Sequence, residues 1–317
     1  MEFLLNFGYI VIAIALIITS SNVFISSASK IAVILNVPSI IIGTLLIGFG
    51  NALPELAISI TSALNDCTRL AIGNAYGSNL VNSGLVLGLI SIISPIAVHS
   101  LLLKREIPWL FISMLLATVA VSNGELSRTE SAVLLTLCII YIITSVNTGI
   151  EEANSGEDEK QKAKKGELLL QTVITFAGLI VLSLSSKLFI YGAVNIARLL
   201  EISELVIGIT IIAFGTSVPE LFSSIIAVRR KENDLAIGNL IGSNIFNLLG
   251  VIGIAGVISP SMVENDVLCR DAFVAAVMTL FLFVCTCSKK ITRINGIILV
   301  LMYAVYITYM ICNVIIR

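Results

Sequence analysis

Charged residues are scarce in this chain of 317 residues, at 12 % against 57 % for apolar residues. A soluble domain carries about 25 % charged residues. Half of that share cannot cover a globule of this size with a polar surface, and the mean hydropathy of +1.04 agrees. The composition therefore excludes a soluble enzyme, a disordered chain and a nucleic-acid binder, and it makes a lipid bilayer the expected surroundings.

Residues that bind soft metals are sparse as well. The six cysteines are scattered without a C-x-x-C pair, so we interpret them as small fillers of membrane helices. His99 is the only histidine, and its position in a loop beside Lys104 and Arg105 predicts a surface residue. No H-E-x-x-H sequence is present, so an intramembrane enzyme is not indicated. We expect no enzymatic activity and no cofactor.

Long apolar runs are abundant, and a helix needs about 20 apolar residues to cross a bilayer. Ten spans are predicted, at residues 4–28, 38–64, 70–95, 105–122, 129–148, 168–192, 204–228, 235–259, 269–288 and 294–315. The chain is then an all-α polytopic membrane protein. A first five-helix repeat covers residues 1–148, a polar linker covers 149–167, and a second repeat covers 168–317.

Lysine and arginine are unequally shared between alternate loops. One side holds thirteen: Lys30, Lys104, Arg105, Lys160, Lys162, Lys164, Lys165, Arg229, Arg230, Lys231, Lys289, Lys290 and Arg293. The other side holds six: Arg69, Arg128, Lys187, Arg198, Arg270 and Arg317. Basic loops stay in the cytoplasm, which predicts a cytoplasmic linker and both termini outside. Lys187 is the one basic residue within a predicted span, and we interpret its ammonium as reaching the interface.

The chain contains an internal repeat. Residues 43–88 align with 208–253 without a gap, at a constant offset of 165 residues and with 20 identities in 46 positions. Each half has five spans, an odd number, so the second copy enters the membrane with opposite polarity. Inverted repeats of this kind are typical of secondary transporters, which bind substrate near the midplane between the repeats.

A glutamate lies near the middle of a span in each repeat. A carboxylate at the bilayer centre costs about 2.5–3.5 kcal/mol on insertion scales, so Glu55 and Glu220 are expected to face a cavity, a partner or an ion. Pro54 and Pro219 directly precede them. Because proline removes a backbone donor, we expect a broken helix at this depth, with carbonyls such as that of Gly48 turned into the cavity.

The following helix of each repeat supplies neutral oxygens on one face, since residues four apart share a face. We predict ion ligation by Ser78, Asn82, Ser243 and Asn247, and helix packing by Asn74 and Asn239. Hard oxygen ligands favour Ca²⁺, Mg²⁺ or Na⁺ over Zn²⁺ or Cu⁺. Two carboxylates would neutralise one Ca²⁺ or two monovalent cations.

The paired sequences GFGNALPEL and AFGTSVPEL, each followed by AIGN and GSN, resemble the two α-repeats of the calcium/cation antiporter superfamily. The whole chain is similar to the prokaryotic sodium/calcium exchangers. The resemblance implies eight core helices around four ion sites, with the first and sixth helices sliding across them. It implies Ca²⁺ ligation by Glu55 and Glu220, and ion-site roles for Asn51, Ser78, Asn82, Thr216, Ser217, Ser243 and Asn247.

The chain departs from the family pattern at two places. Asn51 and Ala52 replace a Thr-Ser pair, and Asn247 replaces a frequent Asp. Both changes reduce oxygen or charge at the expected Na⁺ positions. A buried carboxylate beside a like charge holds a proton more readily, so exchange of Ca²⁺ for H⁺ is an alternative to exchange for Na⁺.

The expected function is extrusion of cytoplasmic Ca²⁺ against inflow of Na⁺, with Ca²⁺/H⁺ antiport as the alternative. A passive cation channel is a weaker alternative, because tight binding by two carboxylates suits exchange better than rapid flow. We expect a monomer in the plasma membrane of a bacterium or archaeon, with lipid, Ca²⁺ and Na⁺ or H⁺ as its partners.

Overall fold

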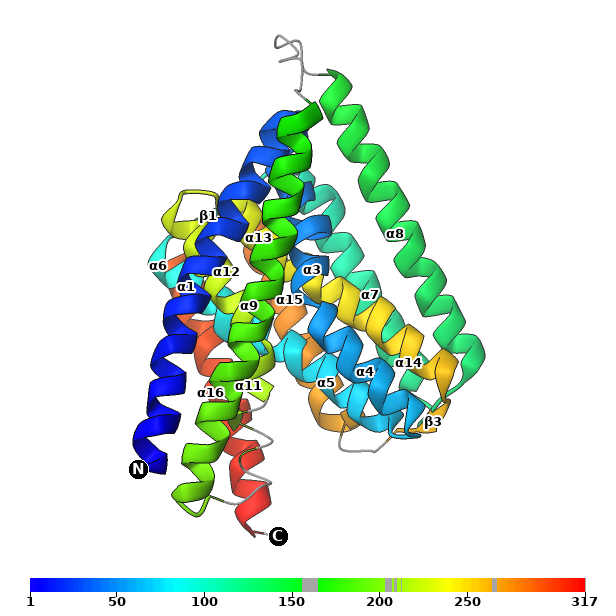
Figure 1. Ribbon diagram of the computed structural model, residues 1–317. Helices are drawn as coiled ribbons and strands as arrows, with labels where there is room; N and C mark the ends of the chain where they lie inside the picture. Colours follow the sequence, from blue (N-terminus) through cyan, green and yellow to red (C-terminus); the bar gives the residue numbers. More distant parts are fainter. Residues whose placement is uncertain (156–164, 203–206, 208–209, 212, 264–266, 317) are drawn as a thin grey trace.

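Two long helices run along one side of the computed structural model, which describes residues 1–155, 165–202, 207, 210–211, 213–263 and 267–316. These are α1 (Glu2–Leu35) and α9 (Lys165–Leu199), which pack side by side and run in opposite directions (Figure 1). Both chain ends lie at one end of the molecule, here called the terminal face. The opposite end, where α8 ends and α9 begins, is called the linker face. Residues 156–164 of the predicted linker lie outside the described residues.

The other elements follow the predicted spans closely. In the first half they are α2 (Ser39–Ile42), η1 (Gly43–Gly48), α3 (Phe49–Asn51), α4 (Leu53–Leu64), α5 (Thr68–Leu80), η2 (Val81–Val86), α6 (Leu87–Ile93), β1 (Ile96–Ala97), η3 (Leu102–Glu106), α7 (Ile107–Val121), β2 (Glu125–Leu126) and α8 (Arg128–Ser155). In the second half they are α11 (Ala213–Thr216), α12 (Val218–Arg229), α13 (Asn233–Phe246), η5 (Asn247–Val251), α14 (Ile252–Ile258), β3 (Ser261–Met262), η6 (Val267–Ala272), α15 (Phe273–Cys287), β4 (Lys290–Ile291) and α16 (Arg293–Ile316). The η segments are π-helical turns.

The described helices bear out a mostly helical membrane protein, but they do not establish ten spans. Seven of them are long and apolar enough to cross a bilayer, or eight if Ser39–Asn51 and Leu53–Leu64 are counted as one span with a 42° bend. The predicted span 105–122 is divided between η3 and the 15-residue α7. The predicted span 204–228 begins at residues outside the described part.

The backbone follows the same plan in both halves. Left-handed backbone occurs at Asn36 and Glu201, at Asp66 and Lys231, and at Gly124 and Lys289. Each pair is separated by the offset of 165 found in the sequence repeat. The short strands follow the same plan. β1 and β3 are equivalent at this offset, as are β2 and β4, and β1 pairs with β4 just as β3 pairs with β2. These strands were not predicted, since two residues leave no periodic pattern.

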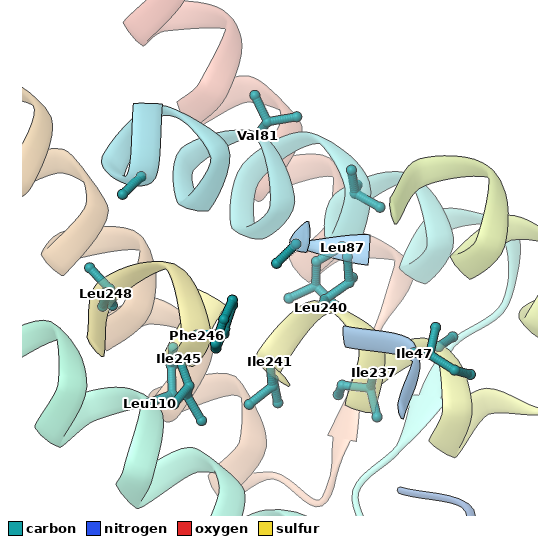
Figure 2. Packing of buried hydrophobic residues seen from close by; sticks show 14 of the residues in the cluster. Ile47, Val81, Leu87, Leu110, Ile237, Leu240, Ile241, Ile245, Phe246 and Leu248 are labelled. Carbon is teal, nitrogen blue, oxygen red and sulfur yellow. The ribbon is translucent and has the colours of Figure 1, made fainter. Parts of the chain in front are cut away.

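Helix α13 lies at the centre of the core. Every residue from Leu235 to Phe246 is buried. Its apolar side chains, among them Leu240 and Ile245, belong to the large buried apolar cluster that is partly drawn in Figure 2. A helix that is buried on all sides lies in the interior of a bundle. The core is therefore built around the second-half helix that carries predicted site residues.

Two buried acidic clusters lie outside the predicted ion site. Glu106 is fully buried; Arg105 Nη1 lies 2.7 Å from its Oε1, and Tyr141 OH donates to its Oε2 at 2.8 Å. At the positions 165 residues later, Arg270 Nε donates to Asp271 Oδ1 at 2.6 Å and Tyr306 OH donates to the same atom at 2.9 Å. The sequence repeat therefore extends well beyond residues 43–88 and 208–253, in chemistry as well as in backbone.

Substitution of the cluster tyrosines should weaken the fold. Tyr141→Phe and Tyr306→Phe each remove a donor to a buried carboxylate, so we expect each to lower the free energy of unfolding by about 1–3 kcal/mol. The measurement is the thermal unfolding midpoint of the purified protein in detergent. Tyr309→Phe is the matched control, because Tyr309 is 54 % exposed. Equal midpoints for all three variants would contradict the proposed stabilisation.

Candidate cation-binding site

The two predicted helix breaks position the glutamates. In the first, α3 ends at Asn51, Ala52 has φ −80° and ψ 0°, and α4 restarts at Leu53 with Pro54 in its first turn. In the second, α11 ends at Thr216, and α12 starts at Val218 after a break at Ser217. Glu55 and Glu220 therefore both lie in the first turn of a helix, where the helix dipole favours negative charge.

Both glutamates are fully buried, and their four carboxylate oxygens accept no hydrogen bond from the described residues. The two groups lie close enough to interact electrostatically. A buried charge without a partner is costly. A buried carboxylate pair of this kind either holds a proton or binds a cation.

Several neutral oxygens of the predicted site residues are also buried without a partner. Within the described part of the chain, no hydrogen bond reaches the buried Asn51 Oδ1, Ser78 Oγ, Asn82 Oδ1, Ser217 Oγ or Asn247 Oδ1. Buried polar atoms are normally hydrogen-bonded. An acceptor set of this size, all of it oxygen, suits a hard cation such as Ca²⁺ or Na⁺. No group of three or more His, Cys, Asp or Glu side chains that could together hold a metal ion is found among the described residues.

Hydrogen bonds fix the direction of the amide oxygens. Asn82 Nδ2 donates to Asn244 Oδ1 at 3.1 Å, and Asn247 Nδ2 donates to Asn79 Oδ1 at 3.3 Å. Asn51 Nδ2 donates to neighbouring side chains of α12 and α13 at 2.9 Å each. The amide donors are thus held by the other half of the chain, and the oxygens stay available for a ligand.

These hydrogen bonds also involve two asparagines that were not predicted from the sequence. Asn79 and Asn244 hold the reciprocal bonds between the repeats. Both follow the serine in GSN and are identical at the 165-residue offset, which is the signal that could have found them. Asn239 is fully bonded: it accepts from Asn51 and donates to Ser224 Oγ at 2.9 Å. A packing role for Asn239 agrees with the prediction.

One expectation about the helix break is wrong. The Gly48 carbonyl does not point freely into the site, because it accepts hydrogen bonds from Ala52 N at 3.1 Å and from Ser243 Oγ at 2.9 Å. The helix stays hydrogen-bonded up to Ala52, so the break falls later than Gly48. Ser243 thus differs from Ser78 in having a partner, while its oxygen keeps lone pairs. Thr216 is buried next to Ser217.

Glycines let η1 approach α13 closely. A Cβ on Gly48 would lie 2.8 Å from both Asn239 O and Ser243 N, and a Cβ on Gly242 would collide with the backbone of Thr44. Small residues allow this type of contact between membrane helices. The contact carries the Ser243–Gly48 hydrogen bond and brings Asn51 within reach of α13.

The sequence profile of the sodium/calcium exchanger protein family matches two segments of the chain, residues 5–147 and 170–312. The chain belongs to the sodium/calcium exchanger family. It is thus a member of a family of multi-pass membrane antiporters that exchange cations, and its family resemblance is confirmed. The family consists of transporters and not of enzymes.

Individual relatives cover nearly the whole chain. Inner membrane protein YrbG of Escherichia coli strain K12 is 32 % identical over 293 residues, which cover 90 % of each chain. The sodium/calcium exchanger MaX1 of Methanosarcina acetivorans is 28 % identical over 343 residues, covering 95 % of this chain and 97 % of that protein. The solved sodium-calcium exchanger NCX_Mj superposes with a TM-score of 0.86 at 33 % identity, over 96 % of this chain and 99 % of that one.

The close helix contact can be tested by adding one methyl group. Gly48→Ala should force η1 away from α13 and lower the free energy of unfolding by about 1–3 kcal/mol, the usual cost of overpacking. Thermal unfolding in detergent measures this effect. Gly8→Ala, where no described heavy atom lies within 4 Å of the added Cβ, should be neutral. Equal unfolding midpoints for the two variants would show that the contact tolerates separation.

Proposed function

We propose that this protein is a secondary active antiporter that exports Ca²⁺ from the cytoplasm while Na⁺ flows in. The buried pair Glu55 and Glu220, with unpartnered oxygens, is the observation that supports this most. Two negative charges balance one Ca²⁺, and surrounding oxygens can complete the six to eight ligands that Ca²⁺ takes. The proposed ligands are Glu55, Glu220, Asn51, Ser78, Asn82, Thr216, Ser217, Ser243 and Asn247.

Competition for this oxygen set would couple the two fluxes. Na⁺ also prefers hard oxygen ligands, so it can replace Ca²⁺ at the same carboxylates. MaX1 is a sodium/calcium exchanger, and NCX_Mj has been solved after soaking with Na⁺ together with Ca²⁺ or Sr²⁺. Ions are the cargo in this proposal, and no resident cofactor is needed.

We further propose ten spans, arranged as two inverted five-helix repeats at residues 1–148 and 168–317, which are joined by the linker 149–167. The opposite directions of α1 and α9 and the 165-residue offset between the two halves support this arrangement. The excess of basic residues on the linker side supports a cytoplasmic linker and external termini. A monomer in a bacterial or archaeal plasma membrane completes the proposal.

Ca²⁺/H⁺ exchange is the second candidate, and specific residues favour it. Ala52 offers no side-chain oxygen where the resemblance leads us to expect a hydroxyl, and Asn247 is neutral where it leads us to expect a carboxylate. Fewer Na⁺ ligands would leave the glutamates to carry protons. Both candidates use the same fold and the same Ca²⁺ ligands.

Counter-ion dependence separates the candidates. We expect proteoliposomes loaded with Na⁺, at equal pH on both sides, to take up radiolabelled Ca²⁺ only while an outward Na⁺ gradient exists. Uptake that needs an outward proton gradient instead would establish the second candidate. Uptake without any counter-ion gradient would indicate a channel and overturn both.

Neutralising either glutamate should stop exchange. Glu55→Gln and Glu220→Gln keep the side-chain volume but remove one of the two charges that balance Ca²⁺, so we expect uptake at the background of empty vesicles. Glu125→Gln, at an exposed residue of β2, is the control and should transport normally. Thermal unfolding confirms that the variants fold. Substantial exchange by a folded Glu55→Gln or Glu220→Gln variant would refute the site.

A further inference from the structure

Two helix pairs that are equivalent in the repeat differ: the pair near the linker face is closed, and the pair near the terminal face is open. Near the linker face, α1 packs along α12. The pair related by the 165-residue offset is α9 and α4, and a groove of about 430 Å³ lies between these helices near the terminal face. The side chains show the difference, because Ile58 of α4 is 43 % exposed and its equivalent Ser223 of α12 is fully buried.

Polar bonds hold the closed pair together. Arg230 Nε, at the end of α12, donates to Asn22 Oδ1 of α1 at 2.9 Å. Ser29 Oγ of α1 donates to Glu232 Oε1 at 2.6 Å. These two bonds, here called the linker-face latch, join residues more than 200 positions apart in the chain.

The open pair has a basic residue and an asparagine at the positions equivalent to the Arg230–Asn22 bond, but on the opposite helices. Lys187 of α9 takes the place of Asn22, and Asn65 at the end of α4 takes the place of Arg230. Both side chains line the groove. Lys187 makes no hydrogen bond or ion pair with any described residue. Asn65 Nδ2 donates to Thr61 O at 2.7 Å, which leaves its Oδ1 available.

We propose that Lys187 Nζ donates to Asn65 Oδ1 when the groove closes, and so forms a terminal-face latch that alternates with the linker-face latch. This proposal rests on the proposed antiport. In transporters with inverted repeats, access alternates as one repeat moves against the other. The groove reaches Pro54, the residue before Glu55, so its closure would cover the approach to the site from the terminal face. Lys187 is thus a positioning residue that acts on ion access and not as a ligand.

The latches are unequal in strength. The second linker-face bond has no counterpart, because Val194 and Cys67 stand at the positions equivalent to Ser29 and Glu232. Two bonds therefore stabilise the state that is open at the terminal face, and one bond stabilises the opposite state. The state that is open toward the terminal face, which the structure shows, should therefore be the more stable one.

Disulfide trapping tests the alternation without relying on transport. In a chain whose native cysteines are replaced by serine, each pair removes the latch bond of its own face. Asn22→Cys with Arg230→Cys should therefore cross-link faster in detergent without added ions than Asn65→Cys with Lys187→Cys. Adding Ser29→Ala and Glu232→Gln to the second pair should speed its cross-linking. A rate unchanged by these two substitutions, or rapid cross-linking of both pairs in one four-cysteine protein, would overturn the proposal.

Transport provides the second readout, in a parent shown beforehand to exchange Ca²⁺. Lys187→Met should raise the apparent Ca²⁺ affinity at the terminal face and lower it at the linker face, each by about two- to tenfold, since the apparent affinity follows the population of the competent state. Asn22→Ala should shift both in the opposite direction. Lys187→Arg should retain the latch, and Lys290→Met, at an exposed residue, should change neither affinity. Equal losses on both faces would indicate structural damage and contradict the latch.

The two proposals fail in different ways. If the parent fails to exchange Ca²⁺ under every gradient tested, the proposed antiport fails. The cross-linking rates still report on the closure of each face in that case. If the parent exchanges Ca²⁺ and Lys187→Met leaves both affinities unchanged, the latch fails and the antiport stands.

Discussion

Two carboxylates buried at one place in an apolar bundle are the constraint on which the rest of the structure depends. On insertion scales a charge at the bilayer centre costs about 2.5–3.5 kcal/mol, and Glu55 and Glu220 have no protein partner among the described residues. The fold reduces this cost, because each glutamate sits in the first turn of a helix, at the positive end of its dipole. Other buried oxygens also lack a partner among the described residues. A divalent cation would supply the remaining compensation.

The small residues and the asparagines follow from that constraint. A cation needs oxygens from both repeats at bonding distance, so the helices must approach closely, and Gly48 and Gly242 allow this. The amide groups must also present their oxygens and not their NH₂ groups. The bonds from Asn82 to Asn244 and from Asn247 to Asn79 achieve this by holding each NH₂ group in the opposite repeat.

The sequence located the two buried glutamates and the helix breaks beside them, but it missed details of the backbone. Glu55 and Glu220 stood out because a lone charge in an apolar run has few explanations, and Pro54 and Pro219 located the breaks beside them. The expected free carbonyl at Gly48 was wrong, because proline removes a donor at its own position while the turn before it remains bonded. The buried groups of Glu106 and Asp271 lie near span ends, where a charge looks ordinary in sequence, so their burial emerged only from the packing of Tyr141 and Tyr306. The number of spans stayed a prediction, because a broken or short helix cannot be recognised as one membrane crossing from its length and hydropathy alone.

The two halves have the same backbone plan, but the helix pair near the linker face is closed and the equivalent pair near the terminal face is open. Transport would be controlled by the residues that differ between these pairs. All of this depends on one claim, that the two glutamates and the oxygens around them form a single Ca²⁺ site. Equilibrium binding of radiolabelled Ca²⁺ to the purified protein tests it most directly. We expect one Ca²⁺ per chain, displaced by the coupling ion and lost when Glu55 and Glu220 are both changed to Gln. Stoichiometric binding that survives in the folded double variant would contradict it.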